Sequence, residues 1–371
     1  MTQIDDVESS VDHARRHVRE LLAEWQAEHG LTPHNDSWMR SFDREFSKMM
    51  ASRGLMGLTW PTGVGGGGRS NVERLAVTEE LLRAGAPVAA HWVGDRQIGP
   101  SVLRHGSQEL IDELIPGILS ADFVFCLGMS EPDSGSDLAS VRTRAQATSE
   151  GWVLHGHKIW TSHAHHATHA YVLARTSSTG RKHEGLSEFI VDMNQPGVLI
   201  EPIRDMAGET HFNEVHFDGA VVPRHRLLGV ENNGWRQVIE QLSFERGGAE
   251  RFLSTYPLLA QLSTAAGDDA RIYAQLGELA CQLGVLRRMA WDLAVAMDTG
   301  QPQVNQAAAL KFLGHRYEIA VIELAAQIRR TPGTPLFEGF RDALLASPGF
   351  GIRGGSADVL LSIITREENK R

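Results

Sequence analysis

The nine residues Met129–Asp137 combine a proline, a glycine and several hydroxyl and carboxyl groups within one short segment. Pro132 fixes one backbone dihedral and Gly135 allows a positive φ, so successive backbone N–H groups of this segment could converge on one ligand. Such donors suit an anion or the polar edge of a cofactor ring. A turn without a ligand is the alternative, because Asp, Ser and Gly are also ordinary turn residues.

Four histidines lie close together in the sequence, His163, His165, His166 and His169, and their density suggests a metal site. No carboxylate stands near them, and alternate residues of a strand point to opposite faces, so these imidazoles would not converge on one ion. We therefore predict no metal site.

Two further motifs were tested against the sequence. Gly63–Gly68 matches the dinucleotide pattern G-x-G-x-x-G. That pattern requires a buried strand before it and alternating strands and helices after it, whereas Leu58–Pro61 is short and contains a proline. We predict a loop between helices instead. The chain lacks a G-x-S-x-G turn, so the nucleophile of an α/β-hydrolase is missing.

The composition excludes several classes of protein. The chain has 371 residues and a formal net charge of −10, with dispersed basic residues, which argues against nucleic-acid binding. Cys126 and Cys281 are far apart, so neither a disulfide framework nor a metal knuckle is expected and a cytoplasmic location fits best. No secretory signal and no long apolar run appear, so we expect no membrane insertion.

The hydrophobic periodicity changes twice along the chain. Helical spacing predicts helices in the first third. These helices cover residues 11–27, 37–53, 72–83, 97–105 and 108–120. Short runs rich in β-branched and aromatic residues then predict seven strands. These strands cover residues 123–128, 143–148, 152–159, 169–176, 186–191, 198–204 and 213–222. Three long helices, at 235–259, 273–299 and 303–329, and a shorter one ending at Thr365 follow.

These elements predict an α+β protein of three parts. Residues 1–121 form an N-terminal helical domain, residues 122–228 a β-barrel-like middle domain, and residues 229–371 a C-terminal four-helix bundle.

This order, together with four separate motifs, resembles the acyl-CoA dehydrogenase family over nearly the whole chain. Met129–Asp137 is similar to the family's flavin and substrate loop, and Lys158–Ser162 to its second flavin-facing strand. Phe217–Pro223, followed by Leu227–Gly229, is similar to the exit from the β-domain. Gly354–Asp358 is similar to the flavin-contacting turn before the last helix.

The resemblance implies FAD as cofactor and oxidation of an acyl-CoA thioester at its α and β carbons. A flavin ring needs backbone donors and a flat apolar wall, and the loop with its neighbouring tryptophan offers both. The implied cofactor-binding residues are Leu127, Met129, Ser130, Gly135, Ser136, Trp160, Ser162, Gly355, Ser356 and Asp358. The implied substrate-binding residues are Ser136, Ser243 and Arg246.

The chemistry requires a carboxylate beside the α carbon, desolvated enough for a raised pKa. The family carries this glutamate at one of two positions. Gly354 occupies the second, whereas Glu245 occupies the first, between apolar Phe244 and Arg246. We predict Glu245 as the catalytic base; a solvated helix glutamate paired with a basic residue is the alternative.

Two family motifs are incomplete. The R-x-x-F-G motif, which reaches a neighbouring subunit's flavin diphosphate, is missing after Arg251. The Q-x-x-G-G motif keeps Gln327 but has Arg330 and Thr331 in place of its two glycines. We therefore expect a second acyl-CoA dehydrogenase-like subunit in a heterotetramer, with a homo-oligomer as the alternative.

Similar pairings occur in actinobacterial enzymes that act on CoA thioesters of steroid fragments. Glycines at 247, 248, 354 and 355 fit a bulky acyl group near the base. An electron-transfer flavoprotein would accept the electrons. The alternatives are a flavin oxidase or monooxygenase on the same fold, and a non-catalytic subunit that completes a partner's site.

Overall fold

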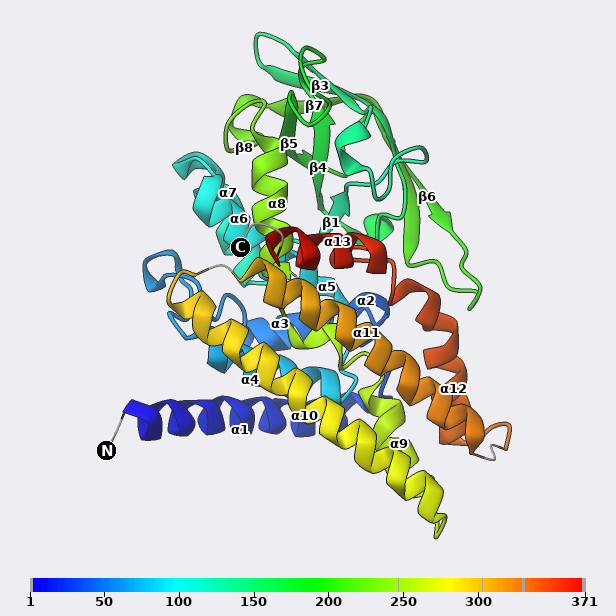
Figure 1. Ribbon diagram of the computed structural model, residues 1–371. Helices are drawn as coiled ribbons and strands as arrows, with labels where there is room; N and C mark the ends of the chain where they lie inside the picture. The colour runs from blue at the N-terminus through cyan, green and yellow to red at the C-terminus, as the bar shows by residue number, and fades with distance from the viewer. Residues whose placement is uncertain (1–2, 246, 302, 329–330, 369–371) are drawn as a thin grey trace. The chain divides into compact units, whose positions relative to one another are not determined.

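The computed structural model describes residues 3–245, 247–301, 303–328 and 331–368. The chain divides into two compact units (Figure 1). The unit that we call the helical unit comprises Met1–Phe42, Arg69–Ala89 and Ser243–Arg371. The sheet unit comprises Asp43–Gly68 and Ala90–Leu242. No helix of the described residues is long and apolar enough to cross a membrane.

The helical unit joins helices from the two ends of the chain. They are α1 (Gln3–His29), α2 (Ser37–Arg40), α4 (Asn71–Arg83), the short η6 (Ala249–Arg251), α9 (Tyr256–Ala265), α10 (Ala270–Asp298), α11 (Val304–Gln327), α12 (Pro335–Ala346) and α13 (Ala357–Glu368). Helix α1 packs on α4, and α10 lies beside both α4 and α11 (Figure 1). Val18 and Leu21 of α1 are fully buried, so their helix contributes one apolar face to the core.

A buried ion-pair network connects three of these helices. Glu79 of α4 accepts hydrogen bonds from Arg15 of α1 at 2.5 Å and from Arg287 of α10 at 2.7 Å. Burial raises the pKa of the Glu79 carboxyl, but the two arginines outweigh burial, so this pKa lies below its usual value. The carboxylate therefore stays charged and ties both ends of the chain to α4.

The sheet unit contains the helices of the first third that are not in the helical unit, and all the strands. Its helices are α3 (Arg44–Ser52), α5 (Ala89–Val93), the π turn η2 (Gly94–Ile98), α6 (Gly99–His105) and α7 (Gln108–Leu119). Its strands are β1 (Phe125–Gly128), β2 (Arg144–Ala147), β3 (Gly151–Lys158), β4 (His169–Arg175), β5 (Leu186–Asp192), β6 (Val198–Ile203), β7 (Phe212–Pro223) and β8 (Leu227–Leu228).

The strands form one mixed sheet in the order β6-β7-β3-β2-β4-β5-β8, and β1 pairs with β4. The β1–β4 and β2–β4 pairs are parallel, and the other pairs are antiparallel. A core cluster joins Leu114 of α7 and Val102 of α6 to Tyr171 and Ile190 of the central strands. Strands β4 and β5 are consequently buried along almost their whole length.

The α+β class and the order of helices, sheet and helices are confirmed. The seven predicted strands are all present, with the two-residue β8 as an addition.

The predicted helix 37–53 is wrong, because α2 and α3 are separate. Phe42 forms a β-bridge with Val88 between them, and the Asp43 side chain caps α3 by accepting from the N–H groups of Glu45 and Phe46.

The predicted helix 235–259 is also wrong. Helix α8 (Gly234–Glu245) ends before Gly248, whose backbone is extended, and Pro257 begins the separate helix α9. The described C-terminal third therefore contains six α-helices rather than the four predicted.

Candidate functional site

The Met129–Asp137 loop is closed by its own backbone. Glu131 and Ser134 exchange both N–H to C=O hydrogen bonds, at 2.9 and 3.0 Å, around Pro132. The Ser134 hydroxyl donates to the Asp137 carbonyl at 2.7 Å. Gly135 is exposed and does not have a positive φ, so the turn does not use the conformational freedom that glycine allows. The proline and the paired backbone shape this turn.

A buried ion pair fastens the loop to the end of β3. The Lys158 ammonium lies 2.8 Å from Glu131 Oε1 and donates to the Met129 carbonyl at 3.0 Å. Glu131 also accepts from the N–H groups of Arg142 at 2.6 Å and Thr143 at 2.9 Å. Three segments of the chain therefore meet at one carboxylate.

Both partners of this ion pair are desolvated. Burial raises the pKa of the Glu131 carboxyl, but the Lys158 ammonium and the N–H donors outweigh it, so this pKa lies below its usual value. Burial lowers the pKa of Lys158 to about 8, and the carboxylate opposes that shift. Each charge depends on the other, so the pair fixes the position of the loop.

Trp160 follows this lysine in an unusual backbone conformation. Its φ is +59°, a value that bulky residues rarely adopt and that costs on the order of 1–3 kcal/mol. The Ile159 N–H donates to the Ser130 carbonyl and the Thr161 N–H to the Asn213 carbonyl, each at 3.0 Å, so both sides of Trp160 are fixed. Strain of this kind is typical of functional sites.

The strained backbone presents the indole to solvent. The Trp160 ring is 55% exposed and meets Phe212 edge-on, with 5.7 Å between the ring centroids. A flat aromatic ring at the surface offers a stacking face to a ligand ring.

The sheet unit brings seven predicted residues to the loops that follow β1 and β3. Leu127 and Met129 are half-buried against the core, Ser130 and Ser162 are half-buried, and Gly135, Ser136 and Trp160 are exposed. The two loops meet directly, because the residues before Trp160 bond Met129 and Ser130.

These loops suit the edge of a flavin ring. Within the described residues, neither the N–H nor the hydroxyl of Ser130 has a hydrogen-bond acceptor, whereas its carbonyl is used. Free donors therefore stand beside the exposed indole of Trp160, which is the donor set and the apolar wall that an isoalloxazine requires.

The first part of α8 is anchored on the sheet by a buried carboxyl. Glu188 of β5 is 2% exposed, and its Oε2 accepts from the side-chain amide of Gln237 at 2.6 Å. Burial raises the pKa of Glu188 to about 8, so this group is largely neutral at pH 7. The same amide donates to the Leu228 carbonyl at 3.0 Å.

Helix α8 ends at Glu245, the predicted base. The side chains of Ser243 and Glu245, and the whole of Arg246, lie outside the described residues. Their catalytic and substrate-binding roles therefore stay predictions.

The C-terminal turn belongs to the helical unit and is held by a second buried ion pair. Arg353 donates to both oxygens of the Asp36 carboxylate, each at 2.5 Å, and its guanidinium stacks on Trp38 and Phe350. The buried Lys311 ammonium donates to the Phe350 carbonyl. The turn before α13 is therefore rigidly placed.

The turn then brings three predicted cofactor-binding residues together. Gly354 and Gly355 have φ values of +67° and +109°, so both occupy backbone regions that favour glycine. Ser356 receives the Leu360 N–H on its carbonyl at 2.9 Å, and Asp358 stands in the first turn of α13. A helix N-terminus of this kind favours an anionic or hydrogen-bond-accepting ligand.

The predicted space for substrate at the glycines near residue 250 stays a prediction. A Cβ atom on Gly248 would lie 2.0 Å from the Glu250 carboxylate, so a larger residue here would require that side chain to shift. Arg246 and Arg330 lie outside the described residues. Of the residues of the incomplete Q-x-x-G-G motif that are described, Gln327 ends α11 and Thr331 is exposed.

The sequence did not indicate the two buried ion pairs, one formed by Lys158 and the other by Arg353. Lys158 pairs with Glu131 across 27 residues, and Arg353 pairs with Asp36 across 317 residues. In the sequence, Lys158 and Arg353 are charged residues beside an apolar strand or turn. Many exposed charged residues have the same surroundings, so this pattern does not indicate a buried ion pair.

Three family models match the chain in succession. They are the acyl-CoA dehydrogenase N-terminal domain over residues 12–122, the middle domain over residues 126–220 and the C-terminal domain over residues 232–368.

Curated relatives agree with these matches. Acyl-CoA dehydrogenase IpdE1 of Mycobacterium tuberculosis (strain ATCC 25618 / H37Rv) is 35% identical over 333 residues, which is 86% of this chain and 86% of the relative. IpdE1 of Mycolicibacterium smegmatis is 33% identical over 342 residues, again 86% of each chain.

Solved structures show the same fold. The Tcur3481-Tcur3483 steroid ACAD matches with a TM-score of 0.85 and 26% identity, over 98% of both chains. The ChsE4-ChsE5 complex from Mycobacterium tuberculosis matches with a TM-score of 0.81 and 27% identity, over 100% of this chain and 98% of that one.

Proposed function

This chain belongs to the acyl-CoA dehydrogenase family, and we propose that it oxidises the Cα–Cβ bond of a bulky, steroid-derived acyl-CoA thioester. The observation that carries this proposal is the pair of loops locked by Lys158 and Glu131, in which the segment of Ser130 is hydrogen-bonded to the segment that carries the exposed Trp160. The cofactor is FAD, which members of the family use.

Cofactor-binding residues are proposed for each unit by itself. Leu127, Met129, Ser130, Gly135, Ser136 and Ser162 are proposed to line the flavin, with the Trp160 indole on its flank. Gly355, Ser356 and Asp358 of the C-terminal turn are proposed to add backbone and side-chain contacts. When bound, FAD supplies the acceptor for the hydride that leaves the β carbon.

The chain's own residues would control the proton. Glu245 is proposed to take the α proton, because the alternative base position carries Gly354, whose φ of +67° suits glycine and not glutamate. Ser136, Ser243 and Arg246 are proposed to bind the CoA thioester.

Anaerobic addition of a thioester tests the activity. Mixing the flavin-loaded protein with a CoA thioester of a steroid side chain should bleach the oxidised-flavin absorbance, since dehydrogenation delivers two electrons to the flavin. A short straight-chain thioester is the matched comparison and should bleach it far more slowly.

The outcomes of this titration separate the proposals. If neither thioester bleaches the flavin, the chain is not a dehydrogenase of these compounds. Equal bleaching by the short thioester contradicts the bulky acyl group. Rapid reoxidation by oxygen would favour an oxidase over transfer of electrons to an electron-transfer flavoprotein, which we propose as the acceptor.

We also propose a second acyl-CoA dehydrogenase-like subunit. The chain lacks the R-x-x-F-G motif, and its Q-x-x-G-G motif has Arg330 and Thr331 instead of glycines. A side chain at these positions prevents the close backbone approach that a pyrophosphate needs. The similar steroid ACAD and ChsE4-ChsE5 structures each carry the names of two proteins.

Flavin content measures the need for this subunit. The chain produced alone should retain several-fold less FAD per polypeptide than the chain produced together with its partner, because part of each diphosphate site is missing. The ratio of flavin to protein absorbance after gel filtration gives the answer. Full occupancy in the chain alone would show that it forms a complete homo-oligomeric site.

A further inference from the structure

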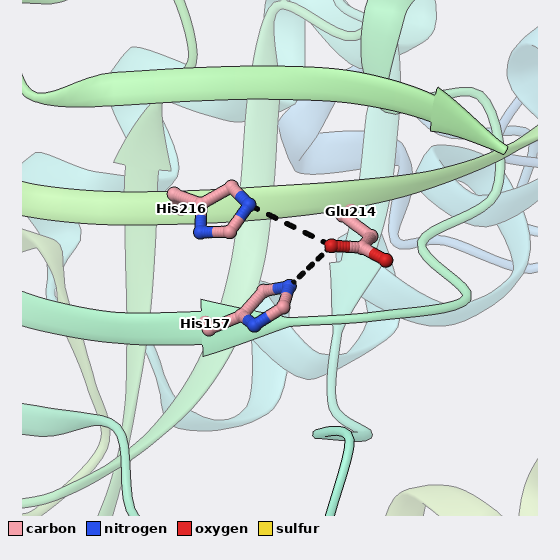
Figure 2. Close-up of side chains that lie close together, drawn as sticks. All are labelled: His157, Glu214 and His216. Carbon is pink, nitrogen blue, oxygen red and sulfur yellow. Dashed lines mark hydrogen bonds and ion pairs between the residues drawn. The ribbon is translucent and has the colours of Figure 1, made fainter.

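Two histidines and a glutamate converge on one face of the sheet unit, at strands β3 and β7 (Figure 2). The strand register places His157 of β3 directly opposite His216 of β7. Glu214 is two residues before His216 on the same strand, so its side chain lies on the same face. The side chains are 32%, 36% and 32% exposed for His157, His216 and Glu214, and a solvent ion can reach them.

The donor atoms of these three residues point to a common position. Nε2 of His157 is hydrogen-bonded to Oε2 of Glu214 at 2.8 Å, a contact that a bound ion would replace, and Nε2 of His216 lies 3.7 Å from the same oxygen. The two imidazole rings are stacked, with centroids 4.0 Å apart and planes 19° from parallel. Parallel rings aim both nitrogens the same way, as Figure 2 shows.

These separations suit a tetrahedral zinc ion. Zinc bonds to nitrogen and oxygen are about 2.0–2.2 Å long, so neighbouring ligand atoms lie roughly 3.3–3.6 Å apart. The three ligand atoms all lie within 4.8 Å of one another, and the two measured separations bracket the tetrahedral value. Small side-chain rotations would place an ion between them.

A second carboxylate, Glu201 of β6, lies beside His216 but outside the group of three. The register pairs Glu201 with Glu214, and Oε2 of Glu201 lies 3.6 Å from Nε2 of His216. Its side chain is 60% exposed and is therefore free to turn toward the same position. Three neighbouring strands would each supply at least one ligand.

We propose that His157, His216, Glu214 and Glu201 form a zinc-binding site on the outer part of the sheet. Two imidazoles and two carboxylates favour zinc over calcium or magnesium, which prefer oxygen ligands alone. The ion would tie the edge strand β6, which among the described strands pairs with β7 alone, to β3. None of these residues belongs to the proposed flavin site.

This proposal differs from the prediction that the chain has no metal site. That prediction considered only the histidines between 163 and 169, whereas the ligands proposed here are 59 residues apart and come together through strand pairing.

A second group, Asp205, Glu209 and His211, is a weaker candidate. Oδ1 of Asp205 already accepts from the N–H groups of Ala207 and Glu209, at 2.8 and 3.0 Å, and so holds the turn between β6 and β7.

Calorimetric titration with zinc chloride tests the site. The protein should carry no polyhistidine tag and should first be stripped with a chelator. We expect saturable zinc binding by the native protein. The His216→Ala and Glu201→Gln variants should bind zinc about tenfold more weakly or worse. Loss of a residue that only supports a ligand already lowers metal affinity by about tenfold, and loss of the ligand itself should cost at least as much. Zinc should also raise the melting temperature of the native protein more than that of the variants.

His155→Ala is the matched control. His155 lies on the same strand, is 52% exposed and pairs with Asp218 at 3.4 Å, so its removal should leave zinc affinity unchanged. Melting curves without zinc check that each variant folds. Equal zinc affinity in the native, His216→Ala and Glu201→Gln proteins would overturn the proposal, and so would an equal loss in His155→Ala.

Discussion

Replacing Glu245 by glutamine is expected to slow flavin reduction by the acyl-CoA substrate about 10³-fold, with FAD still bound. General-base catalysis contributes about 10²–10⁴-fold, and glutamine keeps the size of glutamate but cannot accept the α proton. Stopped-flow absorbance of the flavin under anaerobic conditions measures the rate. Exchange of the α proton with deuterated solvent should be lost in parallel.

Glu240→Gln provides the control for this result. Glu240 lies on the same helix α8, is 38% exposed and pairs with Arg104 at 2.9 Å, so its neutralisation should leave the rate unchanged. A native rate in Glu245→Gln would show that another group removes the proton. If the complex with a partner subunit is also unaffected, the chain is a non-catalytic subunit.

Replacing Lys158 by methionine is expected to lower the free energy of unfolding by about 3–5 kcal/mol. Lys158 is fully buried, and its removal would leave the 7% exposed Glu131 carboxylate without a cation in a low-dielectric site. The apolar methionine fills the space of the lysine stem, so the loss is electrostatic. Denaturant unfolding followed by tryptophan fluorescence gives the free energy.

Lys182→Met is a control with the same chemistry and almost the same distance. Lys182 lies 2.7 Å from Asp137, compared with 2.8 Å for Lys158 and Glu131, but both members of the first pair are more than half exposed. Water screens exposed pairs, so this variant should leave the free energy of unfolding nearly unchanged. Equal destabilisation by the two variants would contradict the role assigned to burial.

A double variant separates lost pairing from lost packing. Lys158→Met combined with Glu131→Gln removes both charges and should recover much of the lost stability, because the cost of breaking a buried pair lies mainly in the charge left behind. The flavin content of these variants would report whether the loop keeps its shape.

The strands could be predicted because the residue types within each segment indicate a strand without reference to any distant contact. Leu186–Asp192 contains the run Phe189, Ile190 and Val191 between turns, and the structure buries it as strand β5. The strand pattern does not reveal that Glu188 is buried. Its burial is tolerated because its pKa rises and Gln237 donates a hydrogen bond to it.

The helix breaks could not be predicted from periodicity. Apolar spacing continues from α8 into η6, whereas the backbone of Gly248 between them is extended. The break after α2 depends on a β-bridge between Phe42 and Val88, residues that only the folded chain brings together.

The candidate site, too, could be predicted from the sequence only in part. Ser130 and Trp160 could be proposed from the sequence because their motifs are contiguous. The ion pairs that hold these motifs, and the positive φ of Trp160, depend on contacts between segments whose register no local pattern encodes. Gly135 shows a further limit of the sequence. Glycine permits a positive φ, but this residue does not adopt one.

The network around Glu79 has a consequence for synthesis on the ribosome. Arg15 and Glu79 are translated early, but Arg287 follows some two hundred residues later, and the helical unit also needs Ser243–Arg371. The sheet unit has all its residues once Leu242 has emerged. Since domains fold as their residues become available, the middle of the nascent chain would complete its core first. The earliest helices would be the last to be buried, and they would expose apolar surface to chaperones in the meantime.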